Sequence, residues 1–110
     1  MQCHKLGSKL VKIESEDENE FIKTEYLSNS GRYWIGLSDH VNEGHWKWTD
    51  GTKLTGYENW GSGQPNNHLY NQDCVAILKG ILVGVNYEGE WNDEKCTLIL
   101  GYICEKGTFY

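Results

Sequence analysis

Three observations predict an α+β fold for this chain of 110 residues. Helix-like patterns are few, apolar runs typical of strands are short and scattered, and residues 39–73 lack regular periodicity. The length suits one domain, and neither a linker nor an internal repeat divides residues 1–110. We therefore expect a single α+β domain with a small core and one large loop.

The first expected elements are the end of a helix and a short strand. Residues 1–7 predict a helix that stops at Gly7, because glycine is common just past the last helical turn. Residues 9–13 predict a strand in which Val11 and Ile13 share one face, since alternate side chains of a strand point the same way.

A capped helix is expected next. Ser15 and Glu18 have the spacing of a capping box, in which the serine side chain accepts a hydrogen bond from the backbone three residues on. The acidic residues around them suit a first helical turn, where the helix dipole favours negative charge. The helix should extend to about Leu27, with three side chains toward the core: Phe21, Ile22 and Tyr26.

Strand character follows in four short apolar runs, at residues 33–38, 74–78, 82–85 and 98–104. Between the first two of these runs, residues 39–73 contain the only proline of the chain together with several glycines and tryptophans. Long irregular loops in small domains usually carry function. We therefore expect the binding site in this loop.

Charge and hydropathy exclude two classes of partner. The formal net charge of −6 leaves no basic surface of the kind that duplex nucleic acid requires, so no nucleic-acid partner is expected. No apolar run is long enough to insert in a membrane. No signal peptide is visible, and we expect a mature or trimmed form of the protein.

The cysteines predict disulfides and a secreted, extracellular location. None of the four forms a Cys-x-x-Cys pair, which argues against a zinc ribbon or a redox motif. An even number of cysteines in a small domain with a modest core favours two disulfides, which persist in oxidising compartments. Spacing alone leaves the pairing open. The residues concerned are Cys3, Cys74, Cys96 and Cys104.

Several motifs, taken in order, resemble the C-type lectin-like family across nearly the whole chain. They are Trp-Ile-Gly-Leu at 34–37, Trp-Lys-Trp-Thr-Asp-Gly at 46–51, Gln-Pro-Asn at 64–66, Cys-Val-Ala-Ile at 74–77, Trp-Asn-Asp at 91–93 and Tyr-Ile-Cys-Glu at 102–105. The resemblance implies two helices packed on small antiparallel sheets beside a long ligand-binding loop. It also implies the disulfides Cys3–Cys104 and Cys74–Cys96. Members of the family usually begin earlier, so we expect this chain to be short at its N-terminal end and to start within the first helix.

The same resemblance implies a carbohydrate-binding lectin with a calcium ion in the long loop. Calcium takes six to eight oxygen ligands, and amide side chains can both accept and donate hydrogen bonds to sugar hydroxyls. The implied metal ligands, which would also bind the sugar, are Gln64, Asn66, Gln72, Asn92 and Asp93. His68 is a further implied sugar-binding residue, and the resemblance implies a cis bond before Pro65.

Two features of this loop set expectations about affinity and specificity. Gln64 and Gln72 stand where sugar-binding relatives commonly place acids, so Asp93 would be the only carboxylate and calcium binding should be weak. Gln-Pro-Asn combines one residue of the Glu-Pro-Asn loop, typical of mannose-type ligands, with one of the Gln-Pro-Asp loop, typical of galactose-type ligands. Asn66 and His68 favour mannose-type sugars, whereas Tyr70 could supply the aromatic face typical of a galactose site.

A second metal position is implied by some relatives. Its counterparts here are Asp39, Glu43, Asn67, Gln72 and Asp73. Three of these are acidic, which suits calcium. The alternative interpretation is that Asp39 and Glu43 are ordinary surface or turn residues and that Asp73 serves an internal hydrogen bond.

Zinc binding, an exposed tryptophan platform and catalysis have weaker support in the sequence than a calcium-dependent lectin. Zinc could be held by His68 with Asp93 or a neighbouring acid. The spacing of the four histidines matches no zinc motif, and three of them fall in or beside the loop: His4 lies outside it, and His40, His45 and His68 within or next to it. The five tryptophans could form a sugar platform, but at least four of them are expected in the core. The chain has no hydrolase, P-loop or metalloprotease motif, and the acids at 88–94 resemble a turn-rich acidic loop, so no enzyme is expected.

The main alternative is a protein-binding domain of the same fold with a vestigial metal site, or a lectin that needs no metal. Survival of Gln-Pro-Asn and Trp-Asn-Asp favours the lectin. Its expected partners are glycans, among them microbial surface polysaccharides, as for innate pattern-recognition proteins. Oligomers would raise the avidity of a weak single site.

Overall fold

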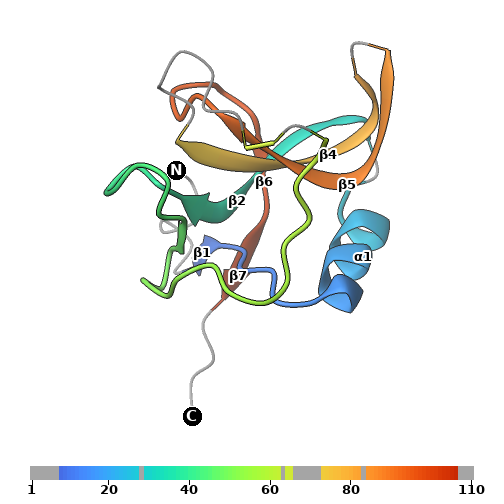
Figure 1. Ribbon diagram of the computed structural model, residues 1–110. Coiled ribbons are helices and arrows are strands. Elements are labelled where there is room, and N and C mark those ends of the chain that lie inside the picture. Colours follow the sequence, from blue (N-terminus) through green and yellow to red (C-terminus); the bar gives the residue numbers. More distant parts are fainter. Residues whose placement is uncertain (1–7, 28, 63, 66–72, 83, 107–110) are drawn as a thin grey trace.

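The computed structural model describes residues 8–27, 29–62, 64–65, 73–82 and 84–106. One helix and seven strands lie in these ranges (Figure 1). In chain order they are β1 Ser8–Leu10, α1 Glu16–Glu25, β2 Gly31–Ser38, β3 Lys47–Trp48, β4 Cys74–Leu82, β5 Val85–Glu94, β6 Gly101–Tyr102 and β7 Cys104–Lys106. The α+β class is confirmed, whereas the helix expected before Gly7 lies outside the described residues.

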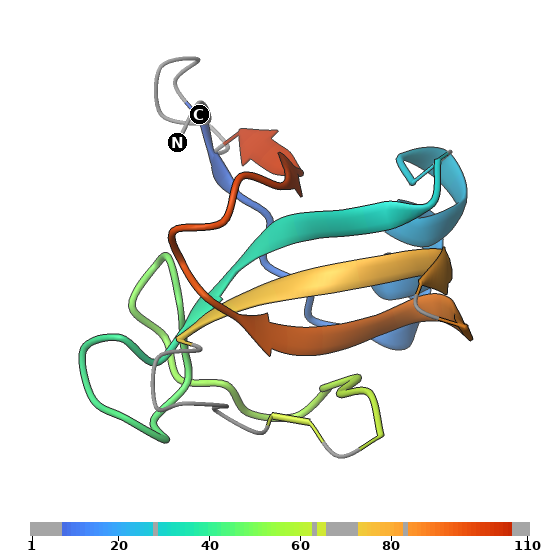
Figure 2. The ribbon, with the colours of Figure 1, turned by 90° about the horizontal axis from the view of Figure 1, so that it is seen from above.

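The strands form one large and one small sheet. The large sheet has the antiparallel order β3-β2-β4-β5, and β6 joins β2 in parallel. Figure 2 shows β2, β4 and β5 side by side, with α1 behind one end of them, on one face of the sheet. The small sheet pairs β1 with β7, so segments from the two ends of the chain are adjacent.

Helix α1 begins as the capping box predicts. The Ser15 Oγ accepts from the Glu18 N–H at 3.1 Å, and the Glu18 carboxylate accepts from the Glu14 N–H at 2.7 Å. Only part of the expected apolar face is buried, however. Ile22 is in the core, but Phe21 and Tyr26 are 56% and 60% exposed, so their assignment to the core was wrong. They stack edge-on against each other at 5.8 Å on the outer side of the helix, because α1 packs on the sheet through a narrow stripe.

The core lies between α1, β1 and one face of the large sheet. Trp91 on β5 is fully buried at its centre, with its ring 5.8 Å from those of both Trp48 and Tyr57. The Trp91 Nε1 donates to the buried Asn19 Oδ1 of α1 at 2.8 Å. A smaller cluster of Trp34, Ala76 and Leu78 covers the opposite face of the sheet.

Gly36, in the Trp-Ile-Gly-Leu motif, lets the chain after β1 approach β2. The Gly36 N–H donates to the Val11 carbonyl at 2.8 Å. A Cβ at this position would lie 2.8 Å from the Leu10 carbonyl oxygen, closer than real contacts allow. Glycine is therefore required here by close backbone approach. Val11 and Ile13 are both buried, as expected from their shared face, although β1 ends before them.

Two expectations about strands are corrected. Residues 82–85 do not form one strand, because β4 ends at Leu82 and β5 begins at Val85, with Gly84 at positive φ in the hairpin turn. The acidic stretch 88–94 is not a turn-rich loop but most of β5. Its acidic side chains alternate with buried glycine and tryptophan, so one strand face is apolar despite the charge.

The disulfides agree with the expected pairing where they can be followed. Cys74–Cys96 is present, with a Cα–Cα distance of 5.1 Å, and ties the start of β4 to the segment after β5. Cys104 is disulfide-bonded as well, and its expected partner Cys3 lies outside the described residues. No helix among the described residues is long and apolar enough to cross a membrane.

Candidate metal centre and adjoining cleft

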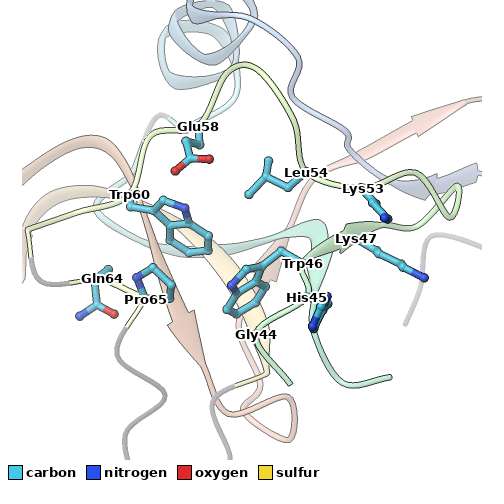
Figure 3. Close-up of a pocket in the computed structure, with 10 residues that line it drawn as sticks. All are labelled: Gly44, His45, Trp46, Lys47, Lys53, Leu54, Glu58, Trp60, Gln64 and Pro65. Atoms are coloured by element: carbon cyan, nitrogen blue, oxygen red, sulfur yellow. The ribbon is translucent and has the colours of Figure 1, made fainter. Parts of the chain in front are cut away.

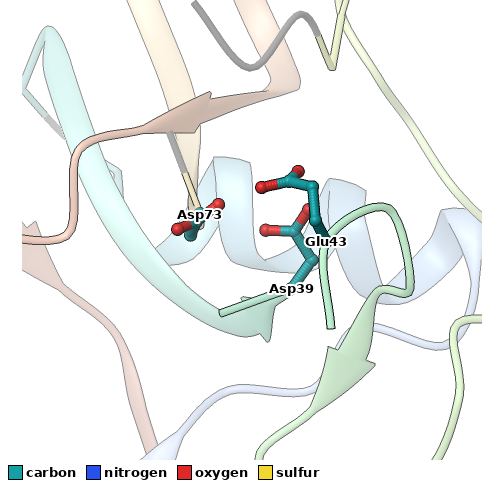
Figure 4. A group of neighbouring side chains, drawn as sticks. All are labelled: Asp39, Glu43 and Asp73. Carbon is teal, nitrogen blue, oxygen red and sulfur yellow. The ribbon is translucent and has the colours of Figure 1, made fainter. Parts of the chain in front are cut away.

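Three carboxylates meet where the long loop leaves and re-enters the sheet. Asp39 follows β2, Asp73 precedes β4 and Glu43 lies in the loop between them, with ligand oxygens all within 4.8 Å of one another. Figure 4 shows the three side chains pointing toward one another. The Asp39 N–H donates to the Asp73 carbonyl at 3.0 Å, which holds the two chain segments together. The fold therefore brings together the three acids among the five residues expected for a second metal position.

Burial makes this cluster unfavourable as a set of bare charges. Asp39 is only 1% exposed. This burial, with smaller contributions from Glu43 and Asp73, raises the pKa of Asp39 from 3.8 to about 7, against the opposing effect of the Gly44 N–H. That N–H donates to the Asp39 Oδ2 at 2.8 Å. A nearby cation would favour the charged form of all three acids.

Four buried oxygens at this end of the molecule lack a hydrogen-bond partner among the described residues. They are Asp39 Oδ1, Gln64 Oε1, Asp73 Oδ1 and Asn92 Oδ1. Buried polar atoms in proteins are nearly always paired, so four such acceptors in one region need an explanation. Carboxylate and amide oxygens are the ligands that calcium prefers, and these residues fit such an ion.

Gln64 is positioned by backbone contacts between the loop and β5. The Trp91 N–H donates to the Asn59 carbonyl, the Gly61 N–H to the Trp91 carbonyl and the Gln64 N–H to the Gly61 carbonyl, at 2.8, 2.8 and 2.9 Å. The loop thus runs alongside β5 and turns at Gly61, where a Cβ would lie 2.9 Å from the Asn92 Oδ1. The Gln64–Pro65 bond is cis, as expected.

The Trp-Asn-Asp motif lies on β5 beside this loop. Asp93 pairs with Val75 in the β4–β5 register and is 2% exposed, so its carboxylate is in the interior. Glu94, the next residue, is 8% exposed and bonds to the Arg32 guanidinium at 2.9 Å. Burial raises the pKa of Glu94, and the Arg32 charge opposes that shift. Glu94, which follows Asp93 on β5, therefore has its own partner in Arg32 of β2.

The remaining expected ligands cannot be located. Asn66, Asn67, His68, Tyr70 and Gln72 lie outside the described residues. Within the described part of the chain, the close group of potential ligands contains acids only and no histidine. His40 instead lies 2.9 Å from the Ser38 Oγ through its Nδ1. The histidine-based zinc alternative has no support from this arrangement.

A cleft of about 480 Å³ adjoins Gln64 and was not anticipated from the sequence. Trp46 and Trp60, whose rings contact each other, line it, and Gln64 and Pro65 lie at one end (Figure 3). Three of the five tryptophans, Trp34, Trp48 and Trp91, are buried as expected, whereas Trp46 and Trp60 pack on the core while remaining half-exposed. The available signal was the density of aromatics in the loop, but nothing in their spacing indicates which ones face outward.

Comparison with known proteins matches this geometry to one family. The family model of the lectin C-type domain matches residues 1–106. The chain is 35% identical over 106 residues to a hepatic lectin of Gallus gallus and 40% identical over 107 residues to a perlucin-like protein of Mytilus galloprovincialis. These matches cover 96% and 94% of the chain, but only 46% and 64% of those two proteins.

Solved structures agree. The carbohydrate-recognition domain of the mouse scavenger receptor C-type lectin superposes with a TM-score of 0.79 at 36% identity, covering 93% of this chain and 74% of that one. The C-type lectin CEL-I of Cucumaria echinata gives a TM-score of 0.75 at 34% identity, covering 93% and 71%. The cow CD23 domain, solved in the presence of a GlcNAc2Man3 oligosaccharide, gives 0.78 at 33% identity, covering 97% and 76%. Because the family model matches nearly the whole chain and relatives of more than 30% identity agree with it, this chain belongs to the C-type lectin domain family.

Proposed function

We propose that this chain is a non-enzymatic lectin domain that binds the terminal sugar of a glycan through calcium at the base of the long loop. The proposed ligands are Gln64, Asn66, Gln72, Asn92 and Asp93, with His68 as a further contact to the sugar. Asp39, Glu43 and Asp73, with Asn67, are proposed to hold a second calcium ion that braces the loop. Residues 1–110 are proposed to act as one domain.

One observation carries the proposal. Buried acceptor oxygens without a partner in the described structure occur on Gln64 and Asn92, and again on Asp39 and Asp73. An unpaired buried acceptor costs roughly 1–3 kcal/mol, so pairing these four oxygens with a bound group would be favourable. A cation, or the hydroxyls of a ligand, would satisfy such atoms.

The chemistry of the amides suits recognition of a sugar. Bound calcium supplies a centre on which two neighbouring sugar hydroxyls can replace water. Gln64 and Asn92 can each accept through the side-chain oxygen and donate through the NH₂ group, so the same residue can serve both cation and hydroxyl. Asp93 contributes charge, and its burial keeps that charge away from water.

The finer properties follow from the composition of the site. With amides at positions 64 and 72, calcium should bind weakly, at dissociation constants of roughly 10⁻⁴–10⁻³ M, typical of extracellular modules. Mannose-type sugars are favoured over galactose-type sugars by the Asn of Gln-Pro-Asn. Glycans of cell surfaces, including microbial ones, would be bound with useful avidity by an oligomer. The Cys74–Cys96 disulfide supports an extracellular location.

A glycan array tests the proposal, run once with millimolar calcium and once with a chelator. The expected result is binding to mannose-terminated glycans that disappears with chelation. Asp93→Asn should abolish it, whereas the matched control Asp17→Asn, on the exposed first turn of α1, should not. Binding that survives chelation, or binding to no glycan, would overturn the calcium mechanism; in the second case a protein ligand becomes the better explanation.

A further inference from the structure

Trp46 and Trp60 lie beside Gln64 and give the cleft one continuous aromatic surface. Neither residue is a ligand of the proposed calcium site. Their ring centroids lie 5.1 Å apart with planes tilted by 56°. Trp60 rests edge-on against the buried Trp91 at 5.9 Å, and the Trp46 carbonyl accepts from the Leu54 N–H at 3.0 Å. Both rings therefore pack on the core and on each other before any ligand arrives.

The rim of the cleft is polar. Glu58 and Lys53 are exposed at its edge, with His45 near Trp46 (Figure 3). Within the described part of the chain, neither Glu58 nor Lys53 takes part in an ion pair. The volume of about 480 Å³ falls in the range of small-molecule sites, roughly 300–1,000 Å³. Aromatic walls with a few polar groups suit a ligand that is apolar on its faces and rich in hydroxyls at its edge.

Gln64 connects this cleft to the proposed calcium site. It lines the cleft together with Pro65, and its buried Oε1 has no hydrogen-bond partner among the described residues. A ligand held at Gln64 by its terminal residue would therefore have its next residue at the mouth of the cleft. Gln64 is therefore shared between the cleft and the proposed calcium site.

We propose that the cleft binds the second sugar residue of a glycan whose terminal residue occupies the calcium site. The apolar C–H face of that second pyranose ring packs on Trp46 and Trp60, while Glu58 and Lys53 bond to its hydroxyls. The inference rests on the proposed function, because it needs the terminal sugar at Gln64. It adds that the domain recognises a disaccharide unit rather than a single sugar.

Calorimetry with calcium present tests this inference on two sugar pairs: methyl α-mannoside against α-mannobiose, and methyl galactoside against lactose. For the preferred pair, the disaccharide should bind the wild-type domain about three- to tenfold more tightly, a gain typical of one aromatic contact. Trp46→Leu should abolish that gain and leave the monosaccharide affinity unchanged. Phe21→Leu, which removes an exposed aromatic ring on α1, is the matched control and should keep the gain.

Each other outcome is informative. Equal binding of mono- and disaccharide to the wild type would overturn the inference and leave the proposed function intact, whereas no binding of any of the four sugars would overturn both. A gain with nitrophenyl mannoside but not with mannobiose would assign the cleft to an apolar group and overturn the sugar assignment. Should Trp46→Leu fail to fold, the indole N–H signals of the wild type decide by NMR: disaccharide must shift those of Trp46 and Trp60, and monosaccharide must not.

Discussion

The sheet interior and the loop base both bury polar atoms, but they treat them differently. In the interior, both ends of the Asn19 amide are paired: Oδ1 accepts from the Trp91 Nε1 at 2.8 Å and Nδ2 donates to the Gly89 carbonyl at 3.1 Å. At the loop base, one buried oxygen of each of three side chains has no partner within the described structure: Asp39 Oδ1, Asp73 Oδ1 and Gln64 Oε1.

The difference separates stability from binding. The paired polar atoms hold α1 against β5. Their burial costs little folding free energy, because each hydrogen bond lost to water is replaced by one within the protein. The buried acceptors that have no partner in the described structure, together with the neighbouring carboxylates, should destabilise the domain when no cation or ligand is bound. Substitutions in the interior should therefore reduce folding stability and leave ligand binding unchanged. Substitutions that remove an acid at the loop base should raise the stability of the metal-free domain and weaken calcium binding.

The largest expected effect is that of Trp91→Ala. Removing this fully buried ring should reduce the free energy of unfolding by about 3–5 kcal/mol, because three aromatic contacts and the bond to Asn19 are lost. Denaturant unfolding followed by circular dichroism measures this. Phe21→Ala, at a residue 56% exposed, should change stability by no more than about 0.5 kcal/mol. Similar losses for the two variants would contradict the placement of the core.

Asn19→Leu should reduce stability by about 1–3 kcal/mol, since the Trp91 N–H would be left buried without an acceptor. In a Trp91→Phe background, which lacks that N–H, the same substitution should cost clearly less. A double-mutant cycle by denaturant unfolding gives the coupling. Calcium binding should be unchanged in Asn19→Leu; weaker calcium binding would show that the two regions are not independent.

Asp39→Asn should stabilise the domain in chelator and weaken its binding of calcium. The pKa of Asp39 is raised to about 7 in the folded state, so folding takes up a proton and wild-type stability falls as pH rises from about 4 to about 7. The advantage of the variant should therefore grow across that interval. Thermal unfolding in chelator at several pH values measures it. An advantage that does not change with pH would show that Asp39 does not titrate there.

Gln64→Glu is expected to have the smallest effect and to act on binding. It places a carboxylate at an acceptor that has no partner in the described structure, and should tighten calcium binding on the order of tenfold. Calcium titration by calorimetry tests this, with Asn29→Asp, the same charge change on an exposed turn, as the control. Equal calcium affinity in wild type and variant would exclude Gln64 as a ligand.

Local signals in the sequence were reliable where the physics is local. The capping box placed the start of α1, and the family resemblance placed the Cys74–Cys96 disulfide and the cis Gln64–Pro65 bond. The predictions were wrong where tertiary contacts determine burial or the limits of a strand. Phe21 and Tyr26 have the spacing of an inward face, yet α1 meets the sheet only along the stripe containing Ile22. The run 82–85 reads as a strand, yet it spans the turn between two longer strands.

By itself, the sequence determined the class of this protein and the chemistry available to it: a disulfide-linked α+β domain with amides and acids in one long loop. These properties depend on residue type and on contacts between near neighbours. Only the tertiary structure decided that Asp39 and Asp73 converge and that Trp46 and Trp60 form a cleft beside Gln64. Both results require strand ends and loop backbone far apart in the chain to pair in one register, and that register is set by the packing of the whole sheet around Trp91.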